Sequence, residues 1–89
     1  MQDIKIIINK LDNLLLEDNL TKLNDLGGKI VGCTIATEGI EPLFAKYPIL
    51  EEIAELGASL ETEKDVEHQQ AMFVLIKEKI DKLKDLSQV

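Results

Sequence analysis

The sequence predicts an all-α fold, a small bundle of three or four helices with a long helix at the C-terminus. Apolar residues recur every three or four positions over most of the chain, which is the spacing of one side of a helix. Only five Gly and two Pro interrupt 89 residues, and 45% of the residues are hydrophobic, which excludes a disordered chain. The length allows one domain, residues 1–89.

The first helix is expected from Ile4 to Leu16, because its apolar residues cluster on one side: Ile4, Ile7, Ile8, Leu11, Leu14 and Leu15. From Leu16 onward the apolar stripe shifts by roughly 120–150° around the helix axis. Either the helix breaks near residues 17–19, where Asp or Asn can cap a new start, or one helix contacts two partners. We favour the break.

Residues 27–40 fit two structures. A strand is favoured by the β-branched residues Ile30, Val31, Thr34, Ile35 and Thr37. A helix is favoured by the spacing of Leu23, Leu26, Ile30, Cys33, Thr37 and Ile40. We favour the helix, with Gly28 and Gly32 allowing a neighbouring backbone to come close, because a lone strand has no pairing partner in this chain. A strand that pairs with its copy across a dimer axis stays open.

The second half of the chain predicts a helical hairpin. After Pro42 a short turn carries Phe44 and Tyr47, and Pro48 then suits the first position of a helix. The stripe of this helix is Ile49, Ile53, Leu56 and Leu60, and Gly57 weakens its end. Thr62 and Asp65 have capping-box spacing, which predicts a last helix from Glu63 to about Leu86. Its apolar side is Val66, Phe73, Ile76, Ile80 and Leu83.

Two segments predict self-association. Residues 72–76 are apolar on every side of the last helix, and the three consecutive isoleucines at residues 6–8 likewise spread apolar surface around the first helix. A single copy would leave part of this surface in water, which monomers seldom do. We therefore expect a homo-oligomer, most simply a homodimer, whose core includes Ile7, Leu11, Leu15, Met72, Phe73, Ile76 and Ile80.

Composition argues against several partners. Ten Lys, no Arg and a net charge of −7 oppose binding to nucleic acid, whose affinity comes largely from cationic contacts to phosphate. The longest apolar run, residues 71–76, falls far short of the ~20 residues that span a bilayer. The N-terminus shows no signal-peptide pattern, and one cysteine forms no internal disulfide. We expect a cytoplasmic protein that binds neither nucleic acid nor membranes and needs no cofactor.

The negative charge is concentrated in one stretch. Residues 51–70 hold seven acids and one Lys, whereas residues 71–89 hold three acids and four Lys. The expected acidic face consists of Glu51, Glu52, Glu55, Glu61, Glu63 and Glu67. Helix dipoles account for most of this placement, because carboxylates favour helix starts and lysines favour helix ends. The face could also attract a basic protein surface.

One acidic pattern suggests an enzyme. The residues Glu51-Glu52-x-x-Glu55 and Glu78-x-x-Asp81 resemble the EExxE and ExxD motifs of all-α nucleotide pyrophosphohydrolases. That resemblance implies a Mg²⁺ site of five carboxylates that binds substrate phosphates and activates water. Against it, Glu51, Glu55 and Glu78 point away from the apolar stripes of their helices. A hairpin turning near residue 61 would also place Glu78 about 15 Å too far along.

The remaining reactive residues predict no site. His68 forms a permitted pair with Asp65 one turn before it, on an exposed helix side, and no second soft ligand is near for zinc. Cys33 is expected to be a small buried residue. We therefore expect a non-enzymatic protein-interaction or regulatory module that acts as a homo-oligomer, with the Mg²⁺-dependent pyrophosphohydrolase as the alternative.

Overall fold

The computed structural model describes residues 4–16 and 22–88 and contains no strand among them. Its helices are α1 (Ile4–Leu16), α2 (Leu23–Cys33), α3 (Glu41–Lys46), α4 (Pro48–Thr62) and α5 (Val66–Ser87). The all-α class and the long last helix, at 22 residues, are confirmed. The expected three or four helices are five, because the predicted turn that carries Phe44 and Tyr47 forms the six-residue helix α3.

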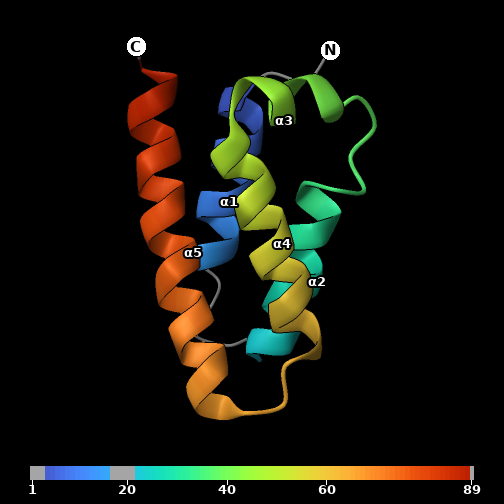
Figure 1. Cartoon of the computed structure of the whole chain (residues 1–89), viewed down its shortest axis with the longest axis vertical. Helices are drawn as coiled ribbons and strands as arrows, with labels where there is room; N and C mark the ends of the chain where they lie inside the picture. The colour runs from blue at the N-terminus through green and yellow to red at the C-terminus, as the bar shows by residue number, and fades with distance from the viewer. Residues whose placement is uncertain (1–3, 17–21, 89) are drawn as a thin grey trace.

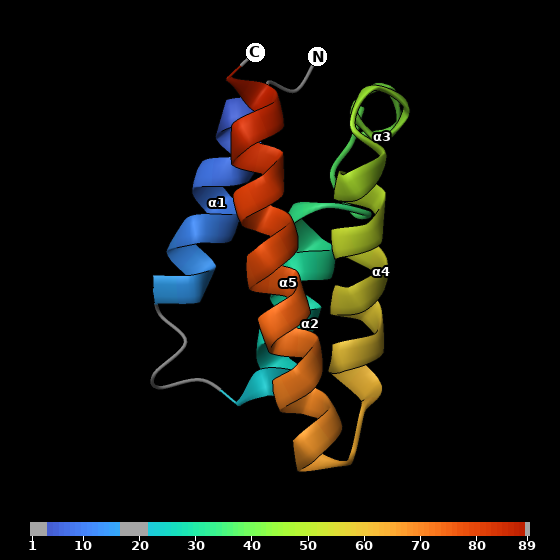
Figure 2. The same ribbon diagram turned by 60° about the vertical axis from the view of Figure 1, so that its left-hand side comes forward.

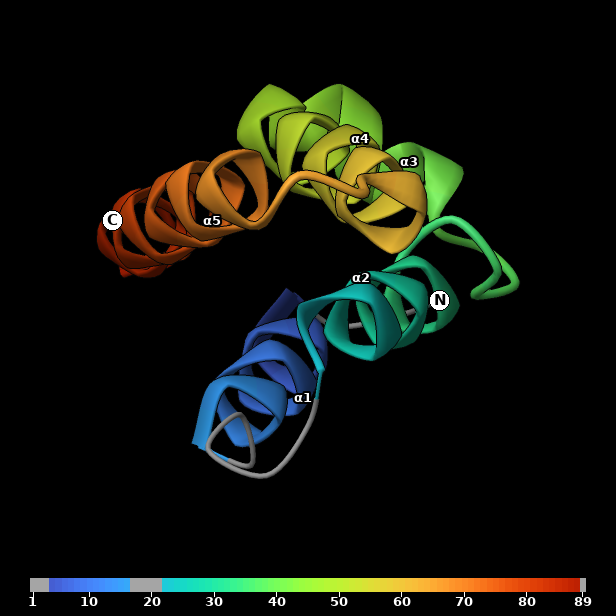
Figure 3. The same ribbon diagram turned by 90° about the horizontal axis from the view of Figure 1, so that it is seen from below.

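Four of the helices form a ring that surrounds the core. Successive long helices run in opposite directions, so that α1 begins and α5 ends at the same end of the bundle (Figure 1). Seen along the bundle, α1, α2, α4 and α5 follow one another around the axis, and α5 returns to contact α1 (Figure 3). Figure 2 shows α5 between α1 and α4. In the described part of the chain, no helix is both long and apolar enough to cross a membrane.

The core is built from the apolar stripes that the sequence predicts. Every helix contributes at least one fully or nearly fully buried aliphatic residue, and each such residue contributes about 1.5–3 kcal/mol through removal from water. In α5 the buried residues are Ile76, Ile80 and Leu83. Val66 was predicted on the same side but is 61% exposed, because α5 begins there and its first turn extends past the neighbouring helices.

The closest helix contact is between α2 and α4, and glycines make it possible. A Cβ on Gly27 would lie 2.5 Å from the backbone N of Glu61 and 2.6 Å from the backbone O of Gly57. A Cβ on Gly57 would lie 2.5 Å from Cγ2 of Ile30. The predicted close approach is therefore correct for this helix but wrong in its residues. Gly28 faces the side chain of Glu61, and Gly32 has open space around it.

The predicted extent of the second helix is wrong at its C-terminal end. Residues 27–33 are helical, which excludes the strand, but the helix does not continue to Ile40. The helix ends just before Thr34 and Ile35, two β-branched residues whose side chains crowd the preceding helical turn. In the turn that follows, Gly39 has a φ of 79, a conformation that favours glycine. Helix α4 passes through Gly57, as its predicted stripe to Leu60 requires, and it continues to Thr62, because the missing Cβ of Gly57 accommodates Ile30. The break predicted near residues 17–19 lies outside the described residues.

The start of α5 differs from the predicted capping box. Asp65, not Thr62, caps the helix, because its Oδ1 accepts a hydrogen bond of 2.9 Å from the backbone N of Glu67. The hydroxyl of Thr62 instead donates to the backbone O of Ser59, within α4. Helix α5 therefore begins at Val66, three residues later than predicted, and residues 63–65 connect the two helices of the hairpin.

Candidate functional site

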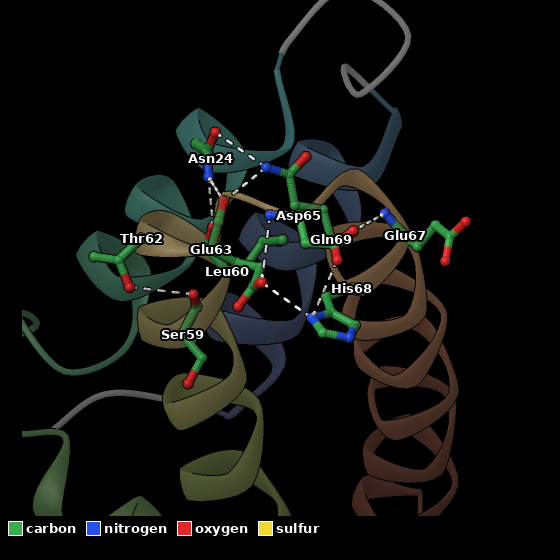
Figure 4. Close-up of polar contacts among 9 residues, drawn as sticks. All are labelled: Asn24, Ser59, Leu60, Thr62, Glu63, Asp65, Glu67, His68 and Gln69. Atoms are coloured by element: carbon green, nitrogen blue, oxygen red, sulfur yellow. Dashed lines mark hydrogen bonds and ion pairs between the residues drawn. The ribbon is translucent and has the colours of Figure 1, made fainter.

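The turn between α4 and α5 is held by a polar cluster (Figure 4). From α2, Nδ2 of Asn24 donates to the backbone O of Leu60 at 2.9 Å and of Glu63 at 2.7 Å. From α5, Nε2 of Gln69 donates to the same Glu63 O at 2.7 Å and to Oδ1 of Asn24 at 3.3 Å. The last carbonyls of a helix have no partner within it, so these side chains complete the end of α4. These hydrogen bonds stabilise the turn between α4 and α5, which accounts for the cluster without a catalytic role.

His68 lies on the solvent side of this cluster. Its Nδ1 is 3.1 Å from Oε1 of Glu63 and 3.8 Å from Oδ2 of Asp65 (Figure 4). The carboxylate within hydrogen-bond distance is therefore that of Glu63, whereas Asp65, the predicted partner, lies near but beyond that distance. The His68 side chain is 67% exposed, as expected for a polar residue on a wet helix side.

Cys33 and His68 belong to different parts of the bundle. Asn24, at the start of α2, contacts the α4–α5 turn near His68, whereas Cys33 ends α2 nine residues, or about 13 Å, further along. Cys33 packs against the core, and burial raises the pKa of its thiol, an effect that the charge of Lys10 partly opposes. A raised pKa lowers the fraction of the nucleophilic thiolate at neutral pH.

The five acids of the pyrophosphohydrolase pattern do not converge. Nζ of Lys79 lies 3.5 Å from Oε1 of Glu52, so that this carboxylate already pairs with an ammonium group. Asp81 lies 4.0 Å from Nζ of Lys84 on the far side of α5. Among the described residues, no three His, Cys, Asp or Glu are close enough to hold a metal ion.

The register predicted for the hairpin is wrong, whereas Glu51, Glu55 and Glu78 are exposed, as their positions away from the apolar stripes predict. The Glu52–Lys79 and Glu63–His68 contacts fix the hairpin, so that Glu78 lies level with α4 residues near Glu52 rather than 15 Å beyond them. The helices achieve this with a connection of only three residues, 63–65. Glu78 is nevertheless exposed on the outer side of α5, and Lys79 is the residue that points to α4.

The predicted acidic face is distributed over several surfaces. Glu51, Glu52 and Glu55 are exposed on α4. The Glu61 carboxylate lies beside Gly28 on α2, where a Cβ would be 2.6 Å from its Oε2. The two remaining members, Glu63 and Glu67, lie in the turn and in the first turn of α5. Only part of the set therefore shares one side of one helix.

Most residues expected in an oligomer core lie in the core of the chain itself. Four are buried, namely Ile7, Leu11, Ile76 and Ile80. Three are partly buried and pack against them, namely Leu15, Met72 and Phe73. The same two segments also present apolar side chains to solvent: Ile6, Val74 and Leu75 are 48%, 52% and 44% exposed. A partner would meet these neighbours rather than the predicted residues.

Leu75 belongs to a surface that both helices of the hairpin form, which we call the α4/α5 face. It comprises Leu56 at the seam and two stripes: Pro48, Glu52, Glu55 and Ser59 on α4, and Leu75, Lys79, Lys82 and Leu86 on α5. Members of each stripe are separated by three or four residues and so share one side of their helix. Glu52 on α4 contacts Lys79 on α5, and the two helices run in opposite directions. Leu56 follows Glu52 by four residues and Leu75 precedes Lys79 by four residues. The two leucines therefore lie at the same level along the hairpin.

Two shallow hollows mark this face. One of about 290 Å³ is lined by Glu52, Glu55, Leu56, Ser59 and Lys79. Another of about 460 Å³, further along the same seam, is lined by Lys46, Tyr47, Pro48 and Leu86. Both mix apolar and charged linings and are open to solvent, which fits contact with another macromolecule better than enclosure of a small substrate.

Comparison with models of known protein families, with curated proteins and with solved structures finds nothing that matches this chain.

Proposed function

We propose that this chain is a non-enzymatic protein-interaction or regulatory module that acts as a homo-oligomer, most simply a homodimer, in the cytoplasm. The observation that carries the proposal is the exposure of Leu75, at 44%, beside the half-buried Leu56 on the α4/α5 face. Leu86, 51% exposed, is a second apolar side chain on the same side of α5, beyond Lys79 and Lys82. Clustered apolar side chains of this kind mark contact surfaces in soluble proteins.

The chemistry of the described residues also favours binding over catalysis. The acids that resemble a Mg²⁺ site diverge, and the charge of Lys79 lies among them. The thiol of Cys33 has a raised pKa and lies in a different part of the bundle from His68. A reaction needs groups that converge on one substrate, and a binding module needs only a complementary surface.

Light scattering across a range of protein concentrations tests the proposal. The wild type is expected at about twice 10.0 kDa. Leu75→Glu places a charge in the contact and should give the mass of one chain, with unchanged helical content by circular dichroism. Val66→Glu is the matched control, because Val66 is also exposed on α5 but lies nine residues away, on the opposite side of the helix.

Each outcome decides the proposal. A wild type with the mass of one chain at every concentration would show that the homo-oligomer is wrong. If Val66→Glu separates the copies and Leu75→Glu does not, the contact lies elsewhere than the α4/α5 face. Phe73 is a poor site for this test because it packs against the core, so that a charge there would disturb folding itself.

A further inference from the structure

The two helices of the α4/α5 face carry opposite charges at the same level. The α5 stripe has lysines in its middle, Lys79 and Lys82, between Leu75 and Leu86 at its ends. The α4 stripe has acids in its middle, Glu52 and Glu55. Lys79 and Glu52 already meet within one chain, at 3.5 Å, which shows that the two charged segments lie side by side. The face is therefore divided lengthwise into an acidic edge and a basic edge.

We infer that the partner of the α4/α5 face is a second copy of this chain, docked so that α4 of each copy lies over α5 of the other. A two-fold axis parallel to the hairpin produces this arrangement, because it exchanges the two edges and keeps each residue at its level. The acidic edge of one copy then meets the basic edge of the other, and the same contact is made twice. A two-fold axis across the hairpin would instead place acid on acid.

The apolar residues fit the same arrangement. At one end, Leu75 of each copy lies level with Leu56 of the other. At the other end, Leu86 lies level with residues beside Pro48 and Tyr47, which line the larger hollow with it. Each copy would thus fill a hollow of the other with an apolar side chain while charged residues surround the contact, which is the usual anatomy of an interface.

Of the four charged residues on the α4/α5 face, two form no ion pair with another described residue and are left for the partner. They are Lys82 on α5 and Glu55 on α4. Glu78 also lies on the outer side of α5 and has no basic residue opposite it in this arrangement. The inferred dimer therefore predicts that Glu78→Gln tightens self-association, although it leaves the Leu75–Leu56 contact unchanged.

A pair of charge-reversed variants tests the inference, which rests on the proposed homo-oligomer. The first variant, E52K/E55K, makes both edges of the face basic, and the second, K79E/K82E, makes both edges acidic. Each variant alone should have the mass of one chain by light scattering, because like charges then face each other. An equimolar mixture should form a dimer of one copy of each, since the basic face of one variant then meets the acidic face of the other.

Controls separate the face from the change in net charge. E38K/E41K and K22E/K29E change the net charge by the same amounts at exposed positions away from the face, and both should remain dimeric. Circular dichroism and thermal unfolding check that all variants are folded. A tag on one variant, with recovery of the other through it, confirms the mixed dimer independently of mass.

The experiments distinguish a wrong docking arrangement of the two copies from a wrong homo-oligomer. If the wild type is dimeric and both reversed variants remain dimeric alone, the copies use another surface, and the inference is wrong while the homo-oligomer stands. If the variants separate but do not combine when mixed, α4 does not lie over α5 of the partner. If the wild type has the mass of one chain at every concentration, both statements fail together.

Discussion

Helix α4 makes two contacts of opposite character, one with α2 and one with α5. On the α2 side, Gly27 and Gly57 bring the backbones together, and no space remains for a Cβ. On the α5 side, the outer edge of the seam is formed by the Glu52–Lys79 ion pair and by shallow hollows. Helix α4 thus stabilises the fold through close backbone packing against α2, and its side toward α5 forms part of a surface that a partner can contact.

The largest expected effect on stability comes from a substitution at the contact between α2 and α4. Gly27→Ala should lower the free energy of unfolding by about 1–3 kcal/mol, because the new Cβ would meet backbone atoms of α4 that cannot rotate away. Gly32→Ala is the matched control in the same helix. Its Cβ meets nothing within 4 Å, so the better helix propensity of Ala should raise stability by up to about 1 kcal/mol.

Urea denaturation followed by circular dichroism measures both changes. Opposite signs for the two substitutions would confirm that the α2–α4 contact, and not the loss of a helical glycine as such, determines the effect. Equal stabilisation by both would contradict the close approach of the two backbones at Gly27.

The next effect is at the end of the hairpin, where α2 holds the α4–α5 turn. Asn24→Ala removes two hydrogen bonds to backbone carbonyls and should lower the free energy of unfolding by about 1–2 kcal/mol. The substitution should also accelerate backbone hydrogen exchange more in residues 60–65, at the end of α4 and in the turn, than in the earlier residues of α4. Asp25→Ala, at an exposed neighbouring position in the same helix, should leave this local exchange unchanged.

The sequence predicts the elements that depend on local rules. The α5 stripe of Ile76, Ile80 and Leu83 is buried because apolar spacing alone determines one side of a helix. Pro48 begins α4 because proline needs no hydrogen-bond acceptor at a helix start. These features follow from residues within a few positions of one another.

The features that depend on which helix covers which side could not be predicted. Apolar spacing places Gly27 in a helix but does not identify α4 as its neighbour. Asn24 has the appearance of an ordinary polar residue near a helix start, and only the fold brings it to carbonyls 36 and 39 residues away. For the five-acid pattern, spacing indicated that Glu78 points away from the apolar stripe of its helix, but it did not reveal that Lys79 would contact Glu52.

A smaller effect is expected on the open side of α4. Glu52→Gln removes the exposed ion pair with Lys79 and should change the free energy of unfolding by less than about 1 kcal/mol. Glu55→Gln is the control, because it removes an acid from the same helix side without breaking an ion pair within the described chain. The difference between the two isolates the contact with Lys79.

The same Glu52 variant tests the enzymatic alternative. Purified wild type, incubated with Mg²⁺ and a panel of nucleoside triphosphates, should release no pyrophosphate, because the acids of the pattern diverge. Glu52→Gln should give the same result. Pyrophosphate release by the wild type that Glu52→Gln abolishes would overturn the binding function and restore the carboxylate site.

The smallest effect should come from the ion pair between α1 and α5, and it depends on pH. Nζ of Lys84 lies 2.8 Å from Oδ1 of Asp12, and this hydrogen bond raises the pKa of the lysine above its ordinary value. A raised pKa in the folded state means that the pair stabilises the protein below the ordinary lysine pKa. That stabilisation is lost as the pH rises through the raised value. Because both side chains of the pair are partly exposed, solvent screens it, and the contribution should be only a few tenths of a kcal/mol.

Thermal unfolding of the wild type and Asp12→Asn measures this contribution. The variant should have a slightly lower Tm than the wild type from pH 7 to pH 9, and the difference should disappear in strongly alkaline solution, where Lys84 is neutral in both proteins. A Tm difference that persists at alkaline pH would mean that Asp12 acts through packing or its own hydrogen bonds rather than through the charge of Lys84.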